Sequence, residues 1–190
     1  MDSPEDLLEI QHEVQAQMGR NLLNYQGIEQ LLKHIIKHSS VEVRKNLDGE
    51  FYLKQTKTER MMLGLLFGQY ISNIVSVEEN DNDIDSSKDT YVSNELSAKF
   101  KFKQTLFHPD QHATLKSRTE QLVDDRNELV HHFRELYPLK SVESCQRALQ
   151  HLNEKNAFSR EQLEYFKQIA IELDNAMAAM AEALDSDEVI

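Results

Sequence analysis

Residues 115–136, LKSRTEQLVDDRNELVHHFREL, decide how the chain folds. Leucines recur every seven residues in this stretch, the spacing of one face of a helix, and Val130 and Phe133 widen that face. The leucines are Leu115, Leu122, Leu129 and Leu136. The pattern predicts one amphipathic helix over about residues 110–136, which Pro138 ends.

Helical signals also occur on both sides of this stretch. The 190 residues are 39% hydrophobic and include only 5 Gly and 3 Pro, a composition typical of a mostly helical protein. Ser3 before Pro4 predicts the start of a helix that reaches about His38, with bends permitted at Gly19 and Gly27. Further helices are predicted over 58–75, after Ser141, and over 159–184, the last with Ser159 as N-cap and Gln162 in a capping box. The expected buried side of the 58–75 helix is Met61, Met62, Leu65, Leu66, Tyr70, Ile71 and Ile74.

The segment between the helices breaks this pattern. We predict a single helical domain over 1–184, an insert at about 77–109 that is first acidic and then rich in Lys and Phe, and a flexible acidic tail at 185–190. Asp48-Gly49 is a turn signal between 41–47 and 51–53, which fits either a short hairpin or a plain connector. In the insert, residues 99–103 alternate lysine and phenylalanine, as in a strand with two unlike faces.

Charge and cysteine content narrow the class of protein. The net charge of -12 opposes nonspecific attraction to nucleic acid and to anionic lipid. The single cysteine, Cys145, excludes an internal disulfide. The acidic N-terminal residues do not fit a signal peptide, and no apolar run approaches the roughly 20 residues of a membrane helix. We therefore expect a cytoplasmic protein with no membrane partner.

Arg126 lies within the apolar stripe of the 110–136 helix. Burying an unpaired arginine costs on the order of several kcal/mol. A carboxylate, a phosphate or a second subunit has to offset this cost. Asn127 and His131 are four residues apart and share another side of the helix, while His132 lies on the opposite flank of the stripe. In a regular α-helix Arg126 and His131 point well over 90° apart, so their convergence requires a long arginine reach or a second chain.

Residues 126–131, RNELVH, resemble the R-N-x-x-x-H signature of the HEPN superfamily. The resemblance implies an all-α, antiparallel helical bundle that is often homodimeric and acts as a metal-independent endoribonuclease. It assigns catalysis to Arg126, Asn127 and His131, with RNA as substrate and no metal or cofactor. Phe133 stands where toxins of the R-x4-H-x-Y form carry a modifiable tyrosine. Pairing with a partner that modifies that tyrosine is therefore not implied, although a protein antitoxin or regulator of another kind fits the resemblance.

These residue types suit RNA cleavage without a metal. Histidine titrates near neutral pH, so His131 fits the acid or base role. The guanidinium of Arg126 presents a charged fork to a phosphate, and Asn127 is expected to orient either the phosphate or His131. Because each chain supplies one histidine of this kind, we expect two copies to meet at a two-fold axis.

Other interpretations remain open. Arg126 can pair structurally with Glu29, and the same helix face can serve a non-catalytic role in an antitoxin, immunity protein or adaptor. His34 with His38 and His108 with His112 have the H-x3-H spacing of metal ligands, but no third ligand follows by spacing. A basic RNA-binding surface is expected from Lys99, Lys101, Lys103, Lys116, Arg118 and His132.

Overall fold

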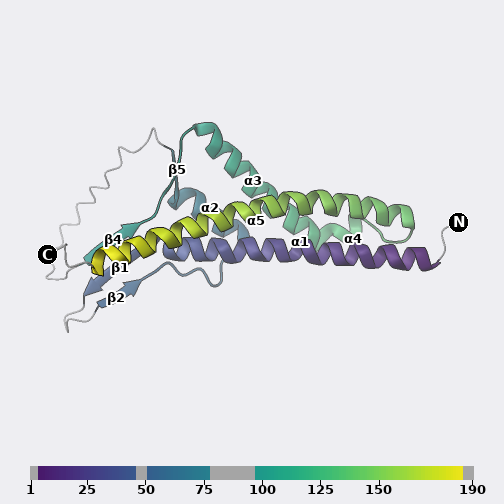
Figure 1. The fold of residues 1–190 in the computed structure, drawn as a ribbon. Coiled ribbons are helices and arrows are strands. Elements are labelled where there is room, and N and C mark those ends of the chain that lie inside the picture. The colour runs from purple at the N-terminus through teal and green to yellow at the C-terminus, as the bar shows by residue number, and fades with distance from the viewer. Residues whose placement is uncertain (1–3, 46–50, 78–96, 186–190) are drawn as a thin grey trace. The chain divides into compact units, whose positions relative to one another are not determined.

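The computed structural model describes residues 4–45, 51–77 and 97–185. Helices dominate this part of the chain, as the composition predicts, and two small sheets accompany them (Figure 1). The helices are α1 (Pro4–His38), α2 (Leu63–Asn73), α3 (Pro109–Asn127), the π-helix η2 (Glu128–His132), α4 (Phe133–Leu136) and α5 (Val142–Asp185). The strands are β1 (Ser40–Lys45), β2 (Phe51–Lys54), β3 (Val75–Val77), β4 (Ser97–Lys101) and β5 (Gln104–Leu106).

The chain forms two compact units. The first comprises residues 1–31 and 118–168, and the second comprises residues 32–117 and 169–190. The long helices α1, α3 and α5 each contribute residues to both units. None of the helices within the described ranges is both long and apolar enough to cross a membrane.

In the first unit, α1 and α5 run parallel, which corrects the expectation of an antiparallel bundle. Asn21 donates to the Leu152 carbonyl at 2.9 Å, and Asn24 donates to Ser159 Oγ at 3.0 Å. A Cβ on Gly27 would lie 3.0 Å from Leu163, so this glycine permits the close approach of the two helices rather than a bend. Residue numbers thus rise together along both helices. Only helices joined by short loops have to be antiparallel, and about 100 residues separate α1 from α5.

Helix α3 runs antiparallel to α5. Asp125 contacts Lys155, whereas Glu128, further along the chain, contacts the earlier residue His151. η2 and α4 continue the chain from α3 to Leu136, and only residues 137–141 lie between α4 and α5, a short connection that favours the antiparallel arrangement. The first unit therefore presents the end of α3 directly to the first half of α5.

Residues 142–185 form one helix, not the two predicted with a boundary at Ser159. Ser159 and Gln162 are 0% and 1% exposed in its interior. The Ser159 hydroxyl donates to the Asn156 carbonyl at 3.1 Å and accepts from Asn24, so it bonds back to its own helix instead of capping a new one. No glycine or proline interrupts residues 142–185, and nothing therefore forces a break.

In the second unit, helix α2 is shorter than predicted. It begins at Leu63 rather than near residue 58, because Thr58 to Met61 form a separate turn. Its buried side chains are Leu63, Leu66, Phe67 and Tyr70, with Ile74 just beyond its end. Met62 and Leu65, expected in the core, are 70% and 62% exposed. Because the helix starts later, Met62 lies just before it and adopts an extended conformation.

Of the two alternatives left open for residues 41–53, the structure shows the hairpin, and the alternating Lys/Phe stretch is a strand only up to Lys101. β1 pairs antiparallel with β2, with Val43 opposite Leu53, and β4 pairs antiparallel with β1 on its other side. β3 and β5 form a separate parallel pair. The turn residues 46–50 and the acidic stretch 78–85 lie outside the described residues. Phe100 and Phe102 line a cavity of about 190 Å³ with the apolar side chains of α5.

Candidate functional site

The motif segment bends away from regular α-helix at the point where the sequence predicts continuity. Residues 128–132 form one π turn between α3 and α4, and such turns are frequent at functional sites. Leu115, Leu122, Leu129 and Phe133 are buried, as the stripe predicts. Leu136, however, is 56% exposed and Val130 is 45% exposed. Since a π turn adds one residue, the position that the heptad assigns to Leu136 passes to Tyr137, whose ring packs on Phe133 at 5.3 Å.

Arg126 closes α3 next to this turn. It is only half-buried, so it escapes the full desolvation that its place in the stripe predicts. The hydrogen bond that the structure gives its guanidinium runs to the neighbouring Asn127 Oδ1, at 3.2 Å. Asn127 is itself exposed. The two side chains therefore form one polar unit that is accessible from solvent.

His131 is the fourth residue of the π turn and is exposed. Its ring lies edge-on to the neighbouring His132 ring, with the centroids 6.3 Å apart. A regular α-helix would separate Arg126 and His131 by about 140° around the axis. A π turn rotates less per residue, so it reduces this angle relative to the separation that the sequence pattern predicts.

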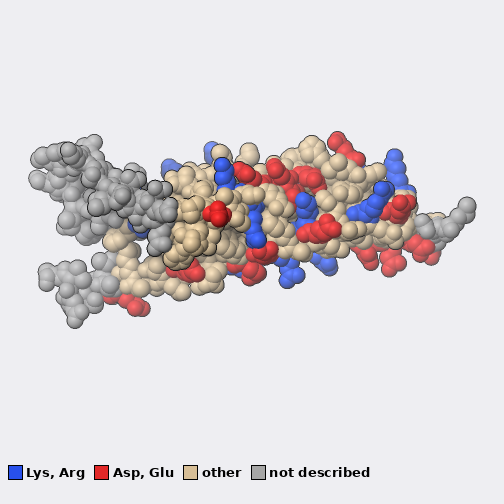
Figure 2. All heavy atoms as spheres, turned by 90° about the horizontal axis from the view of Figure 1, so that it is seen from above, with Lys and Arg blue, Asp and Glu red and all other residues tan. Residues whose placement is uncertain are grey.

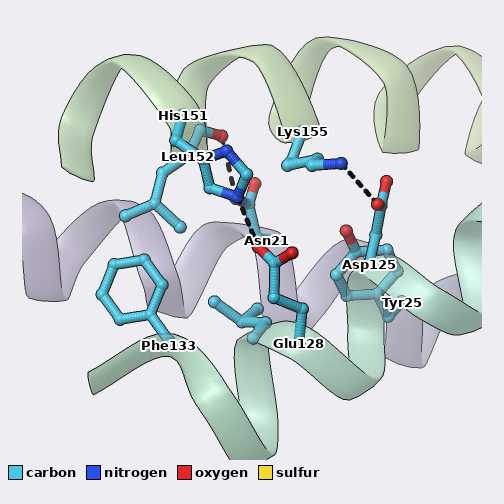
Figure 3. Close-up of a pocket in the computed structure, with 9 residues that line it drawn as sticks. Asn21, Tyr25, Asp125, Glu128, Phe133, His151, Leu152 and Lys155 are labelled. Atoms are coloured by element: carbon cyan, nitrogen blue, oxygen red, sulfur yellow. Dashed lines mark hydrogen bonds and ion pairs between the residues drawn. The ribbon is translucent and has the colours of Figure 1, made fainter. Parts of the chain in front are cut away.

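The inner face of the same segment carries a polar cluster. Lys155 Nζ lies 2.5 Å from Asp125 Oδ1, and His151 Nε2 lies 2.5 Å from Glu128 Oε1 (Figure 3). Both carboxylates flank the Arg126-Asn127 pair in sequence, and both partners come from α5. Sequence reasoning missed His151 and Lys155. His151 and Lys155 are four residues apart, and the carboxylates that they contact, Glu128 and Asp125, are three residues apart. This matched spacing was the available signal that the two helices pair in antiparallel fashion.

Tyr25 of α1 completes this cluster. Its hydroxyl and the second carboxylate oxygen of Asp125 are buried without a hydrogen-bond partner in the described part of the chain. Both residues line a cavity of about 10 Å³, about the volume that one water molecule needs. Burial, reinforced by the negative charges of Asp125 and Glu128, raises the pKa of Tyr25 well above the ordinary value for tyrosine. Tyr25 is therefore held as a neutral phenol.

The predicted RNA-binding residues do not form one surface within a single unit. Lys99, Lys101, Lys103 and Lys116 belong to the second unit, whereas Arg118 and His132 belong to the first. Arg118 forms an ion pair with Glu161 at 2.5 Å, and His132 lies 3.7 Å from Glu135. On the face that Figure 2 shows, acidic and basic side chains are interspersed over the described residues. The expected basic surface thus remains a prediction.

The H-x3-H pair of α1 is engaged with α5 in the second unit. His34 Nε2 lies 2.8 Å from Asp174, and the rings of His34 and His38 are 4.7 Å apart. Desolvation, together with the charges of His34 and Lys37, lowers the pKa of His38. Within residues 4–45, 51–77 and 97–185, no three His, Cys, Asp or Glu side chains are grouped so as to hold a metal ion.

No protein-family model, curated protein or solved structure matches this chain.

Proposed function

We propose that the protein is a cytoplasmic, metal-independent endoribonuclease of the HEPN type, with its site around Arg126, Asn127 and His131. The observation that carries the proposal is an accessible Arg126-Asn127 pair directly before a π turn that bears an exposed histidine, His131. These are the groups needed to neutralise a phosphate and to move protons near neutral pH.

In the proposed reaction the 2′-oxygen of RNA attacks the adjacent phosphorus while its proton passes to a basic imidazole. The bond from phosphorus to the 5′-oxygen then breaks, and that oxygen takes a proton from an acid. The Arg126 guanidinium stabilises the additional negative charge on the phosphate as it becomes five-coordinate. The products are a 2′,3′-cyclic phosphate and a 5′-hydroxyl.

Two proton transfers require two titratable groups, so we propose that the complete site forms in a homodimer that brings together two copies of His131. Val130, next to His131, is an apolar side chain that is 45% exposed, which favours contact with a second copy at this position.

The test is cleavage of a single-stranded RNA in EDTA by the purified protein. His131→Ala is expected to lower the rate at least about a hundredfold, the usual contribution of a proton-transferring side chain. His12→Ala removes another exposed histidine of the first unit, from α1, and should leave the rate unchanged. Equal rates for His131→Ala and the wild-type chain would reject the proposal and favour the non-catalytic alternative.

A further inference from the structure

His151 contacts the first residue of the π turn and a residue beyond its end. Its Nε2 lies 2.5 Å from the carboxylate of Glu128, the first residue of the turn. Its ring also stacks on that of Tyr137, with centroids 4.9 Å apart and planes 28° apart. Tyr137 follows α4, the short helix that comes after the π turn. One imidazole from α5 therefore joins the beginning and the end of the irregular segment.

The environment makes this contact stronger than an ordinary surface pair. The side chains of His151 and Glu128 are 21% and 32% exposed. In the exposed Arg118–Glu161 pair, which joins α3 to α5, the corresponding values are 43% and 58%. Polar contacts that are shielded from water are less screened, so the His151 contact is better able to hold a costly backbone conformation.

The π turn needs such support. Its hydrogen bonds follow an i→i+5 pattern that proteins use rarely, and a regular α-helix is the alternative for the same residues. Reverting to that helix would rotate His131 away from Arg126 and would shift Tyr137 out of its place against His151.

We propose that His151 is a positioning residue of the candidate site, which clamps Glu128 and Tyr137 so that the π turn presents His131 beside Arg126. This inference rests on the proposed ribonuclease activity for its functional consequence, while its conformational part is independent of activity. His151 acts through the turn and is not required to touch RNA.

The test compares three variants by two measurements. His151→Leu removes both contacts, whereas His151→Gln retains an N–H donor toward Glu128. Arg118→Leu removes the exposed ion pair between α3 and α5 and is the matched control. The measurements are amide hydrogen exchange at residues 128–133 and the separate kcat and KM of RNA cleavage.

His151→Leu should raise exchange at residues 128–133 by at least about tenfold relative to α1, and should lower kcat about tenfold with KM within about twofold of wild type. His151→Gln should recover most of both losses, and Arg118→Leu should change neither. Wild-type exchange and kcat in His151→Leu would overturn the inference. If the wild-type chain cleaves no RNA, the proposed function fails. The conformational role of His151 is then judged by exchange alone. Faster exchange in His151→Leu but not in Arg118→Leu supports that role, and unchanged exchange in His151→Leu rejects it.

Discussion

Lys155 Nζ lies 2.5 Å from Asp125 Oδ1, and it is the basic partner of a carboxylate whose side chain is only 5% exposed. The other oxygen of that carboxylate is buried with no hydrogen-bond partner among the described residues. Removal of the lysine therefore leaves a buried charge without compensation.

Lys155→Met should lower the free energy of unfolding by about 2 kcal/mol or more, because it strands the Asp125 carboxylate. The measurement is equilibrium denaturation with urea. Lys167→Met, which breaks the exposed pair with Glu164 on the same helix, should change the free energy by less than about 0.5 kcal/mol. Equal effects of the two substitutions would contradict the assignment of a buried pair.

Tyr25 predicts a specific loss of stability in alkali. Its pKa is raised in the folded chain, whereas in the unfolded chain it loses its proton near pH 10.0. The stabilising contribution is therefore complete below that pH and declines above it, by about 1.4 kcal/mol per pH unit for this one group. Tyr25→Phe should flatten the decline in the free energy of unfolding between about pH 10 and 11.

The control for this prediction is Tyr165→Phe, which removes the hydroxyl of a half-buried tyrosine of α5. It should retain the wild-type slope. The same slope in wild type and in Tyr25→Phe would show that Tyr25 ionises alike in the folded and unfolded chains.

Arg126 is expected to contribute to catalysis more than to stability. The residue is half-buried and its guanidinium is hydrogen-bonded to the adjacent Asn127 on the exposed side, so Arg126→Met should change the free energy of unfolding by less than about 1 kcal/mol. RNA cleavage by this variant should be lost. Arg126→Lys keeps the charge but not the fork, and should reduce the rate about tenfold or more.

A structural ion pair of Arg126 with Glu29 predicts a different result. In that case Arg126→Met should destabilise the fold by about 3 kcal/mol, and activity should fall only through unfolding. Denaturation and initial rates, measured on the same preparation, distinguish the two roles.

The composite site requires a dimer. We expect its two-fold axis near residues 122–133. Light scattering at micromolar concentration should give twice the 22.1 kDa mass of the chain. Val130→Lys should shift this mass toward the monomer, because it places a charge beside His131 at the expected contact. Leu23→Lys, at an apolar residue of α1 that is 67% exposed, should not. A wild-type mass of one chain would contradict the composite site.

Periodicity predicted the helices better than their ends and directions. The heptad identified Leu115, Leu122 and Leu129 as core, but Leu136 is exposed because the π turn shifts the register. An apolar stripe looks the same in either chain direction, so it could not predict that α1 and α5 are parallel. Ser159 looked like an N-cap because the capping pattern is local, whereas its hydroxyl bonds within α5.

The candidate site was predictable only on its outer face. Arg126, Asn127 and His131 form a contiguous motif, which sequence reasoning can recognise. His151 and Tyr25 reach the cluster from other helices, through contacts that depend on how the first unit packs. Tyr25 lies in no pattern that distinguishes it from an ordinary core residue, and the spacing of His151 and Lys155 becomes informative only once α5 is known to run antiparallel to α3.

The chemistry of the cleaved ends tests the central claim most directly. Wild-type protein incubated in EDTA with an end-labelled RNA should yield fragments with a 2′,3′-cyclic phosphate and a 5′-hydroxyl, because the 2′-oxygen is the proposed nucleophile. The same substrate with a single 2′-deoxynucleotide at the cleavage position should be uncut there. Fragments ending in a 3′-hydroxyl, or cleavage that stops in EDTA, would contradict the mechanism proposed for Arg126, Asn127 and His131.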